Sequence, residues 1–79
     1  MLLHKTNVYS NKRRGYDFWT EYRLTDTKVQ RVTCRRRKVI NGTEATFITD
    51  ETIERSWGLY DRDMPLWIRE EMLVQLESL

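Results

Sequence analysis

The sequence contains few of the residues with which small domains reinforce a thin core. Its 79 residues include one cysteine, one histidine and one proline. A single cysteine excludes a disulfide within the chain, and Cys34 with His4 falls short of the four ligands of a structural zinc site. A chain of this length buries only about 60% of the surface that its unfolded state exposes. Its stability must therefore come from packing of its three tryptophans, four tyrosines and two phenylalanines, or from self-association.

Long hydrophobic runs are also missing. No segment approaches the roughly 20 apolar residues of a membrane-spanning helix, and the N-terminal apolar run is too short for a secretory signal peptide. With a single thiol in addition, we expect an intracellular, cytoplasmic protein without a membrane partner. A charged fraction of 33% beside a hydrophobic fraction of 39% is typical of a globular chain. We predict a single domain over residues 1–79, in which residues 1–6 are loose.

Groups for catalysis or cofactor binding are scarce. The three glycines, at positions 15, 42 and 58, cannot form a Gly-rich phosphate loop. The cations beside Cys34 could lower its pKa, but we place this thiol in the core, without a base to activate it. The acidic pairs at 61/63 and 70/71 are explained by loop polarity and a helix surface better than by a metal site. We predict that the protein is not an enzyme and binds neither metal nor cofactor.

Each half of the chain has little charge of one sign. Residues 1–43 carry eleven Lys and Arg against three Asp and Glu, whereas residues 44–79 carry three against nine. Such asymmetry indicates either a surface for a charged partner or pairing between acidic and basic parts. The halves could neutralise each other within one fold. Alternatively, a homodimer could pair the basic part of each copy with the acidic part of the other.

Alternation of side chains predicts an antiparallel sheet. The stretch YDFWTEYRL, residues 16–24, alternates with period two and places Trp19 on the outer face of a strand. Asn-Gly at 41–42 predicts a type I′ turn between strands over residues 29–40 and 43–49, with Ile40 opposite Thr43. The preceding residues also fit an earlier hairpin, with residues 6–10 as a short strand and residues 11–15 as its turn.

This register predicts the two faces of the basic strand. Cys34 lies on the core face, Arg35 and Arg37 point to solvent, and Arg36 and Lys38 reach outward from the margin of the core. A slip of one residue would exchange the two faces.

Two helices are predicted after the sheet. Residues 49–58, TDETIERSWG, have an N-cap candidate, acids in the first turn and a glycine at the end, and Ile53 and Trp57 would face the sheet. A final amphipathic helix starts near Asp63 and places Pro65 in its first turn. Its broad apolar side comprises Leu66, Ile68, Met72, Leu73, Leu76 and Leu79. The fold class is α+β: a three- to four-stranded antiparallel meander with a short helix and a C-terminal helix packed on one face.

The favoured function is a small binding module whose basic hairpin engages an anionic partner, first of all nucleic acid. Binding requires cations for the phosphates and aromatic rings for the bases, and a two-stranded ribbon also fits the major groove of DNA. The alternative is a basic face that is solvated or that meets the acidic helices. The candidate residues are Lys12, Arg13, Arg14, Trp19, Arg31, Arg35 and Arg37.

The second hypothesis is a protein-binding inhibitor or adaptor, a small phage-type accessory or regulatory protein that docks on a larger protein. It would use an aromatic surface next to the acidic helix, because Trp and Tyr are enriched among the residues that dominate binding energy. For Trp67 the alternative is ordinary packing over the sheet edge. The candidate residues are Trp57, Tyr60, Trp67 and Val74.

Overall fold

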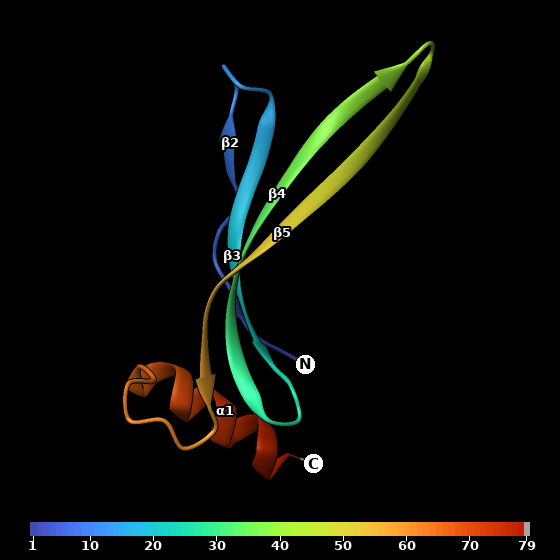
Figure 1. Cartoon of the computed structure of the whole chain (residues 1–79). Helices are drawn as coiled ribbons and strands as arrows, with labels where there is room; N and C mark the ends of the chain where they lie inside the picture. The colour runs from blue at the N-terminus through green and yellow to red at the C-terminus, as the bar shows by residue number, and fades with distance from the viewer. Residues whose placement is uncertain (79) are drawn as a thin grey trace.

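The chain forms a small α+β domain, a five-stranded antiparallel sheet followed by one C-terminal helix (Figure 1). The structure is a computed structural model that describes residues 1–78. The predicted α+β class and the antiparallel sheet are confirmed, with five strands instead of three or four. The elements are β1 (Leu2–Lys5), β2 (Tyr9–Asn11), β3 (Tyr16–Leu24), β4 (Lys28–Asn41), β5 (Glu44–Gly58) and α1 (Leu66–Glu77).

The sheet is a meander with one addition at its edge. Strands β3, β4 and β5 lie side by side in chain order, while β1 and β2 both pair with β3. The expected looseness of residues 1–6 is not found, because Leu3 is buried in the core and holds β1 against β3. The N-terminal ammonium also donates a hydrogen bond to the carbonyl of Leu24, 2.9 Å away. Across residues 1–78, no helix has the length and apolarity to cross a bilayer.

The turn between β4 and β5 differs in type and register from the prediction. Gly42 has a φ of +67°, and Thr43 does not share this positive φ, so the turn has the pattern of type II′ instead of I′. Ile40 consequently faces Ala45 and not Thr43. The predicted register therefore differs from the observed one by two residues. Because side chains alternate between faces with a period of two, each strand keeps its predicted faces.

The two faces of the sheet carry different groups. We call the face of Leu24 and Val29, on which α1 packs, the helix face, and the opposite one the Cys34 face. The continuous register between β3 and β4 places Arg35 and Arg37 on the helix face, beyond the end that α1 covers. Cys34, which was predicted to lie on the core face, is buried on the face that α1 does not cover.

Each face has a separate hydrophobic cluster. The smaller cluster, on the Cys34 face, contains Trp19, Val32 and Cys34. Trp19 is only 8% exposed, because it lies directly opposite Cys34, so its predicted place on an outer face is wrong. The larger cluster, between the sheet and α1, consists of Leu3, Leu24, Val29, Trp57, Met64, Ile68 and Met72.

The short helix predicted over residues 49–58 is absent, and β5 continues instead to Gly58. The long strand β4 requires a partner along its whole length, and β5 supplies it. Arg31 pairs with Arg55 and Val32 with Ile53, so Glu54 is the extra residue of a β-bulge. The bulge turns Trp57 into the core under α1 and leaves Ile53 exposed on the other face.

Helix α1 begins later than predicted. Pro65 occupies the N-cap position without a side-chain cap, and the N–H of Asp63 donates to the carboxylate of Asp61 at 2.8 Å. Asp63 therefore belongs to the preceding turn. Only Ile68 and Met72 of the predicted apolar side are buried, whereas Leu66, Leu73 and Leu76 are exposed. The assignment of Leu79 to that side lies outside the described residues.

Candidate nucleic-acid interface

The end of the helix face that α1 leaves open carries alternating rings and cations. Tyr16 on β3 pairs with Arg37 on β4. Two residues further along, Phe18 pairs with Arg35. The Arg35 guanidinium lies 5.5 Å from the centroid of the Tyr16 ring, within the range of a cation–π contact. The open end therefore presents both kinds of group that a nucleic-acid surface uses.

Three rings lie next to one another on this end of the sheet, with Phe18 between Tyr9 on the neighbouring strand and Tyr16 on its own strand. Tyr9 on β2 pairs with Phe18, and their rings are nearly parallel, with centroids 5.6 Å apart. The Tyr16 ring follows at 6.0 Å from that of Phe18. Tyr9 is 65% exposed and Phe18 is 38% exposed. We call Tyr9, Tyr16 and Phe18 the ring platform.

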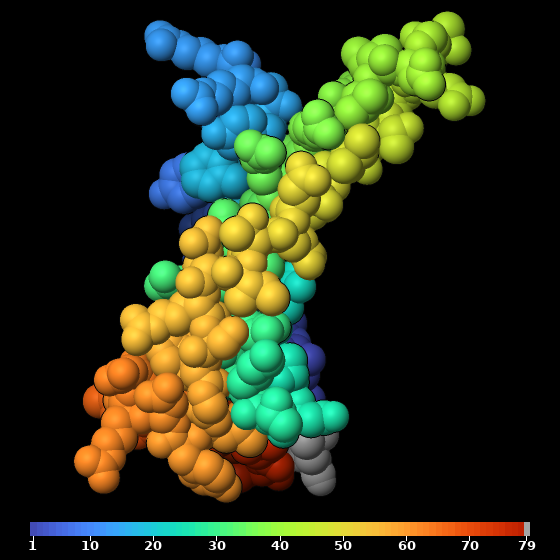
Figure 2. Space-filling view, in the orientation of Figure 1, coloured from blue at the N-terminus to red at the C-terminus, as the bar shows by residue number. Residues whose placement is uncertain are grey.

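The turn between β2 and β3 holds three consecutive cations beside the ring platform. Its conformation is defined by Gly15, with a φ of +70°, whose N–H donates to the carbonyl of Asn11 at 2.9 Å. The Asn11 side chain accepts a further bond from the N–H of Arg14 at 3.1 Å. Figure 2 shows this turn and the β4–β5 hairpin as separate projections away from α1. We call the exposed residues of the β2–β3 turn, Lys12, Arg13 and Arg14, the basic tip.

Most of these cations have no ionic partner within the part of the chain that the structure describes. Neither the basic tip nor Arg37 forms a salt bridge there. Arg35 approaches Asp50 at 3.7 Å, and both side chains are about half exposed, so this pair is weak. The open end therefore presents positive charge that the fold itself leaves largely uncompensated.

Two predicted members of the nucleic-acid site lie elsewhere. Trp19 is on the Cys34 face, where its N–H donates to Glu21 at 2.6 Å and Lys5 lies over its ring. It is therefore no platform for a base. Arg31 is on the helix face but half-buried between Tyr22 and Arg55, four residues nearer to the covered end than Arg35.

The ring platform was missed by sequence reasoning, although a signal for it existed. The turn formers at 25–28 close a tight connection in which the N–H of Thr25 donates to the carbonyl of Lys28. A turn of this kind pairs Leu24 with Val29, and counting back along both strands pairs Phe18 with Arg35. The aromatic side of β3 and the cationic side of β4 then share a face.

The remaining members of the basic run are turned to the Cys34 face. Arg36 pairs with Asp17 at 3.0 Å and lies 5.4 Å from the centroid of the Phe47 ring. A hydrogen bond from Ser10, together with this arginine, holds the pKa of Asp17 below its usual value. Arg36 therefore makes its contacts within the fold, on the Cys34 face. Arg35 and Arg37 lie on the open end of the helix face.

Cys34 is a structural residue. Its burial, reinforced by the charge of Glu21, raises the pKa of the thiol to about 11, so the reactive thiolate is scarce at neutral pH. Hydrogen bonds from Trp19 and Arg23 hold the pKa of Glu21 below its usual value. The Arg23 guanidinium lies above the thiol, with Nη2 3.8 Å from Sγ.

The residues predicted for protein binding divide into buried and exposed ones. Trp57 is 2% exposed and belongs to the larger cluster, so it cannot anchor a partner. Trp67 packs edge-on against His4 and Tyr22, with centroids 5.1 and 4.9 Å away, yet remains partly exposed. Tyr60 and Val74 are exposed. The outer side of α1 therefore keeps an apolar surface among acidic residues.

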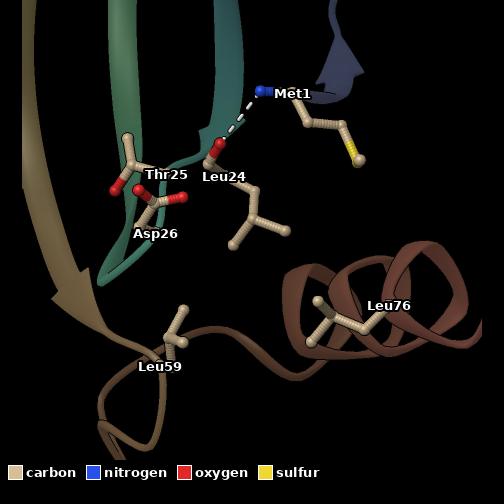
Figure 3. A pocket seen from close by; sticks show the side chains of 6 residues that line it. All are labelled: Met1, Leu24, Thr25, Asp26, Leu59 and Leu76. Carbon is tan, nitrogen blue, oxygen red and sulfur yellow. Dashed lines mark hydrogen bonds between the residues drawn. The ribbon is translucent and has the colours of Figure 1, made fainter. Parts of the chain in front are cut away.

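A small cavity lies between the β3–β4 turn and α1, at the covered end of the molecule (Figure 3). Its volume of about 320 Å³ is at the lower limit of small-molecule sites. Thr25 and Asp26 supply its only polar side chains, a poor set for catalysis or specific recognition. Within residues 1–78, no three His, Cys, Asp or Glu side chains gather to hold a metal. The lining residues are Met1, Leu24, Thr25, Asp26, Leu59 and Leu76.

Comparison of the chain with protein-family models, curated proteins and solved structures finds no match. No function, ligand or site residue is therefore transferred from a relative. The surface of rings and uncompensated cations is the feature of the described chain with the most specific chemistry.

Proposed function

We propose that the protein is a non-enzymatic binding module whose basic hairpins engage an anionic partner, nucleic acid. The observation that carries this proposal is the position of Arg35, Arg37 and the basic tip at the end of the sheet that α1 leaves open. Cations that gather without internal partners repel one another, and a polyanion relieves that repulsion while releasing its own counterions.

Internal neutralisation, the alternative interpretation of the basic run, has limited support. The acidic residues of α1 lie at the covered end of the sheet, away from the basic tip (Figure 1). On the helix face of β5, Asp50 is the acid that approaches Arg35. The acids of α1 and of the connection before it thus lie at the end of the molecule opposite to the basic tip, which favours an external partner for these cations.

The proposed contacts predict a measurable salt dependence. Five cations, the basic tip with Arg35 and Arg37, would give a log–log slope of roughly −3.5 to −4.5. Affinity for a labelled oligonucleotide should then fall on the order of 10²–10³ between about 50 and 200 mM salt. Fluorescence anisotropy measures both values directly.

Paired charge reversals test which part of the surface binds nucleic acid. Arg35→Glu with Arg37→Glu should abolish binding at the lower salt. The matched control, Lys28→Glu with Arg62→Glu, makes the same change in net charge at exposed positions of the other end. If both double variants lose affinity equally, only net charge matters and the proposed face is wrong. If the unmodified protein binds no nucleic acid at about 50 mM salt, the proposed function is wrong.

A second candidate function, docking on a larger protein, is favoured by the outer side of α1. Leu66 is 71% exposed, and Leu73 and Val74 are exposed beside Glu70. Exposed leucines among carboxylates fit a partner that offers an apolar surface rimmed by cations.

Exposed residues give the cleanest test of this second function, because Trp67 also packs within the fold. Leu66→Ser with Tyr60→Ala should weaken capture of such a partner by about 2 kcal/mol or more. The Arg35→Glu and Arg37→Glu variant should bind that partner normally. Normal binding by the Leu66 and Tyr60 variant, with weakened binding by the arginine variant, would contradict a docking role for α1.

A further inference from the structure

The ring platform narrows the class of nucleic acid. We infer that the ligand is a single strand, whose unpaired bases stack on Tyr9, Phe18 and Tyr16 while its phosphates meet the neighbouring cations. This inference rests on the proposed function and goes beyond it, because phosphate contacts alone would accept a single strand and a duplex alike.

The spacing of the rings favours an extended strand. Neighbouring ring centroids are 5.6 and 6.0 Å apart, whereas successive bases on one strand of a duplex rise by about 3.4 Å. Bases in a duplex are stacked on one another and offer edges in the grooves, not free faces. Successive bases of an extended single strand can separate far enough to use these rings.

The exposure of the rings points in the same direction. Tyr9 is the most exposed of the three, and Phe18 is exposed on the open side of the sheet. Neither ring belongs to the two hydrophobic clusters of the fold. Stacking on bases would remove these exposed rings from water.

Cations border the ring platform on two sides. The basic tip precedes Tyr16 in the chain, and Arg35 lies over the Tyr16 ring from the β4 side. A strand that crosses β2, β3 and β4 can therefore keep its bases on the rings and its phosphates near a cation. Stacking accepts every base because each has a π face, so we expect little sequence preference.

Three labelled probes separate stacking from charge. They are a single strand of about 12 nucleotides, the same strand with abasic sugars in place of its nucleosides, and a duplex of the same length. Anisotropy at about 50 mM salt should show that the intact strand binds at least tenfold tighter than the abasic strand and the duplex.

Ring variants locate the effect. Tyr9→Thr with Phe18→Thr preserves strand-forming residues and should reduce affinity for the intact strand about tenfold or more, with affinity for the abasic strand and the salt slope unchanged. Tyr60→Thr, which removes a 95% exposed ring at the other end, is the matched control and should change nothing. Circular dichroism of each variant verifies that the sheet is intact.

The outcomes distinguish this inference from the proposed function. If the abasic strand or the duplex binds as tightly as the intact strand, stacking is wrong while nucleic-acid binding stands. The same holds if the double ring variant, correctly folded, binds the intact strand normally. If none of the probes binds, the proposed function itself is wrong. The rings and arginines would then be candidates for contact with a protein partner.

Discussion

The guanidinium of Arg23 on β3 reaches across β4 and donates to both carboxylate oxygens of Glu51 on β5, at 2.6 and 2.9 Å. It also donates to Glu21 on its own strand at 3.2 Å. This network covers the Cys34 face, where no helix packs on the sheet within the described chain. Three strands are thus joined by ionic hydrogen bonds over the smaller hydrophobic cluster.

Removing the arginine should destabilise the fold modestly. Arg23→Met retains an apolar stem over Cys34 but leaves the two glutamates without their donor. Because these side chains are partly exposed, we expect a loss of about 1 kcal/mol in the free energy of unfolding. Urea denaturation measures the loss. Arg62→Met, at an exposed position, should change stability by less than about 0.5 kcal/mol. Equal effects of the two variants would contradict the importance of the network.

The same network predicts sensitivity to acid. Hydrogen bonds from Arg23 lower the pKa of Glu51, and those from Trp19 and Arg23 lower the pKa of Glu21. A folded pKa below the unfolded one stabilises the protein above the unfolded value, near 4.3 for Glu. This contribution disappears as the pH falls through the folded value. Thermal unfolding between about pH 7 and 2.5 should show this decline. Arg23→Met should flatten it, and an unchanged profile would contradict the assignment.

The buried thiol predicts the opposite dependence at alkaline pH. The pKa of Cys34 rises from an ordinary value of 9.0 to about 11, so the unfolded chain ionises first. The free energy of unfolding should therefore decline between about pH 9 and 11. Cys34→Val, which cannot ionise, should lack this component. In addition, iodoacetamide at pH 8 should label Cys34 slowly in the native protein and rapidly in urea, as measured by mass spectrometry. Rapid native labelling would show that the thiol is accessible.

The continuation of β5 predicts different roles for two residues that a helix would place on one side. Trp57 is buried under α1, so Trp57→Ala should cost about 3–5 kcal/mol. Ile53 lies on the opposite face and is 57% exposed, so Ile53→Ala should cost less than about 1 kcal/mol. Chemical denaturation compares the two variants. Similar large losses would contradict the bulge at Glu54.

The homodimer hypothesis makes a prediction of its own. If the basic end of one copy meets the acidic end of another, sedimentation velocity should show a dimer at about 50 mM salt that dissociates at 500 mM. Arg35→Glu with Arg37→Glu should remain monomeric at both concentrations. A dimer that persists in this variant at high salt would exclude pairing through these charges.

Local patterns predicted the strands well. The alternation over residues 16–24 corresponds to β3, and Asn-Gly at 41–42 marked the correct hairpin. The register failed because it depends on which turn residue takes the positive φ. Gly42 alone takes it, which moves the pairing of Ile40 by two residues. The error left the faces of Arg35 and Arg37 intact because the displacement equals the pleat period.

Long-range packing explains what sequence patterns missed. Residues 49–58 have helix-like ends, but the pairing demand of β4 overrides these local preferences. Trp19 appeared to be an outer residue because alternation within one strand cannot tell which face is covered. That choice depends on the pairing with Cys34 and on the place where α1 packs, which are properties of the folded chain.

The two hydrophobic clusters lie on opposite faces and have no residue in common. A substitution at Val32 and one at Ile68 are therefore expected to add independently in a double-mutant cycle. In evolutionary terms, the lineage of this chain could revise the packing beneath its helix without disturbing the packing around Cys34. Each face of the sheet could then diverge at its own rate.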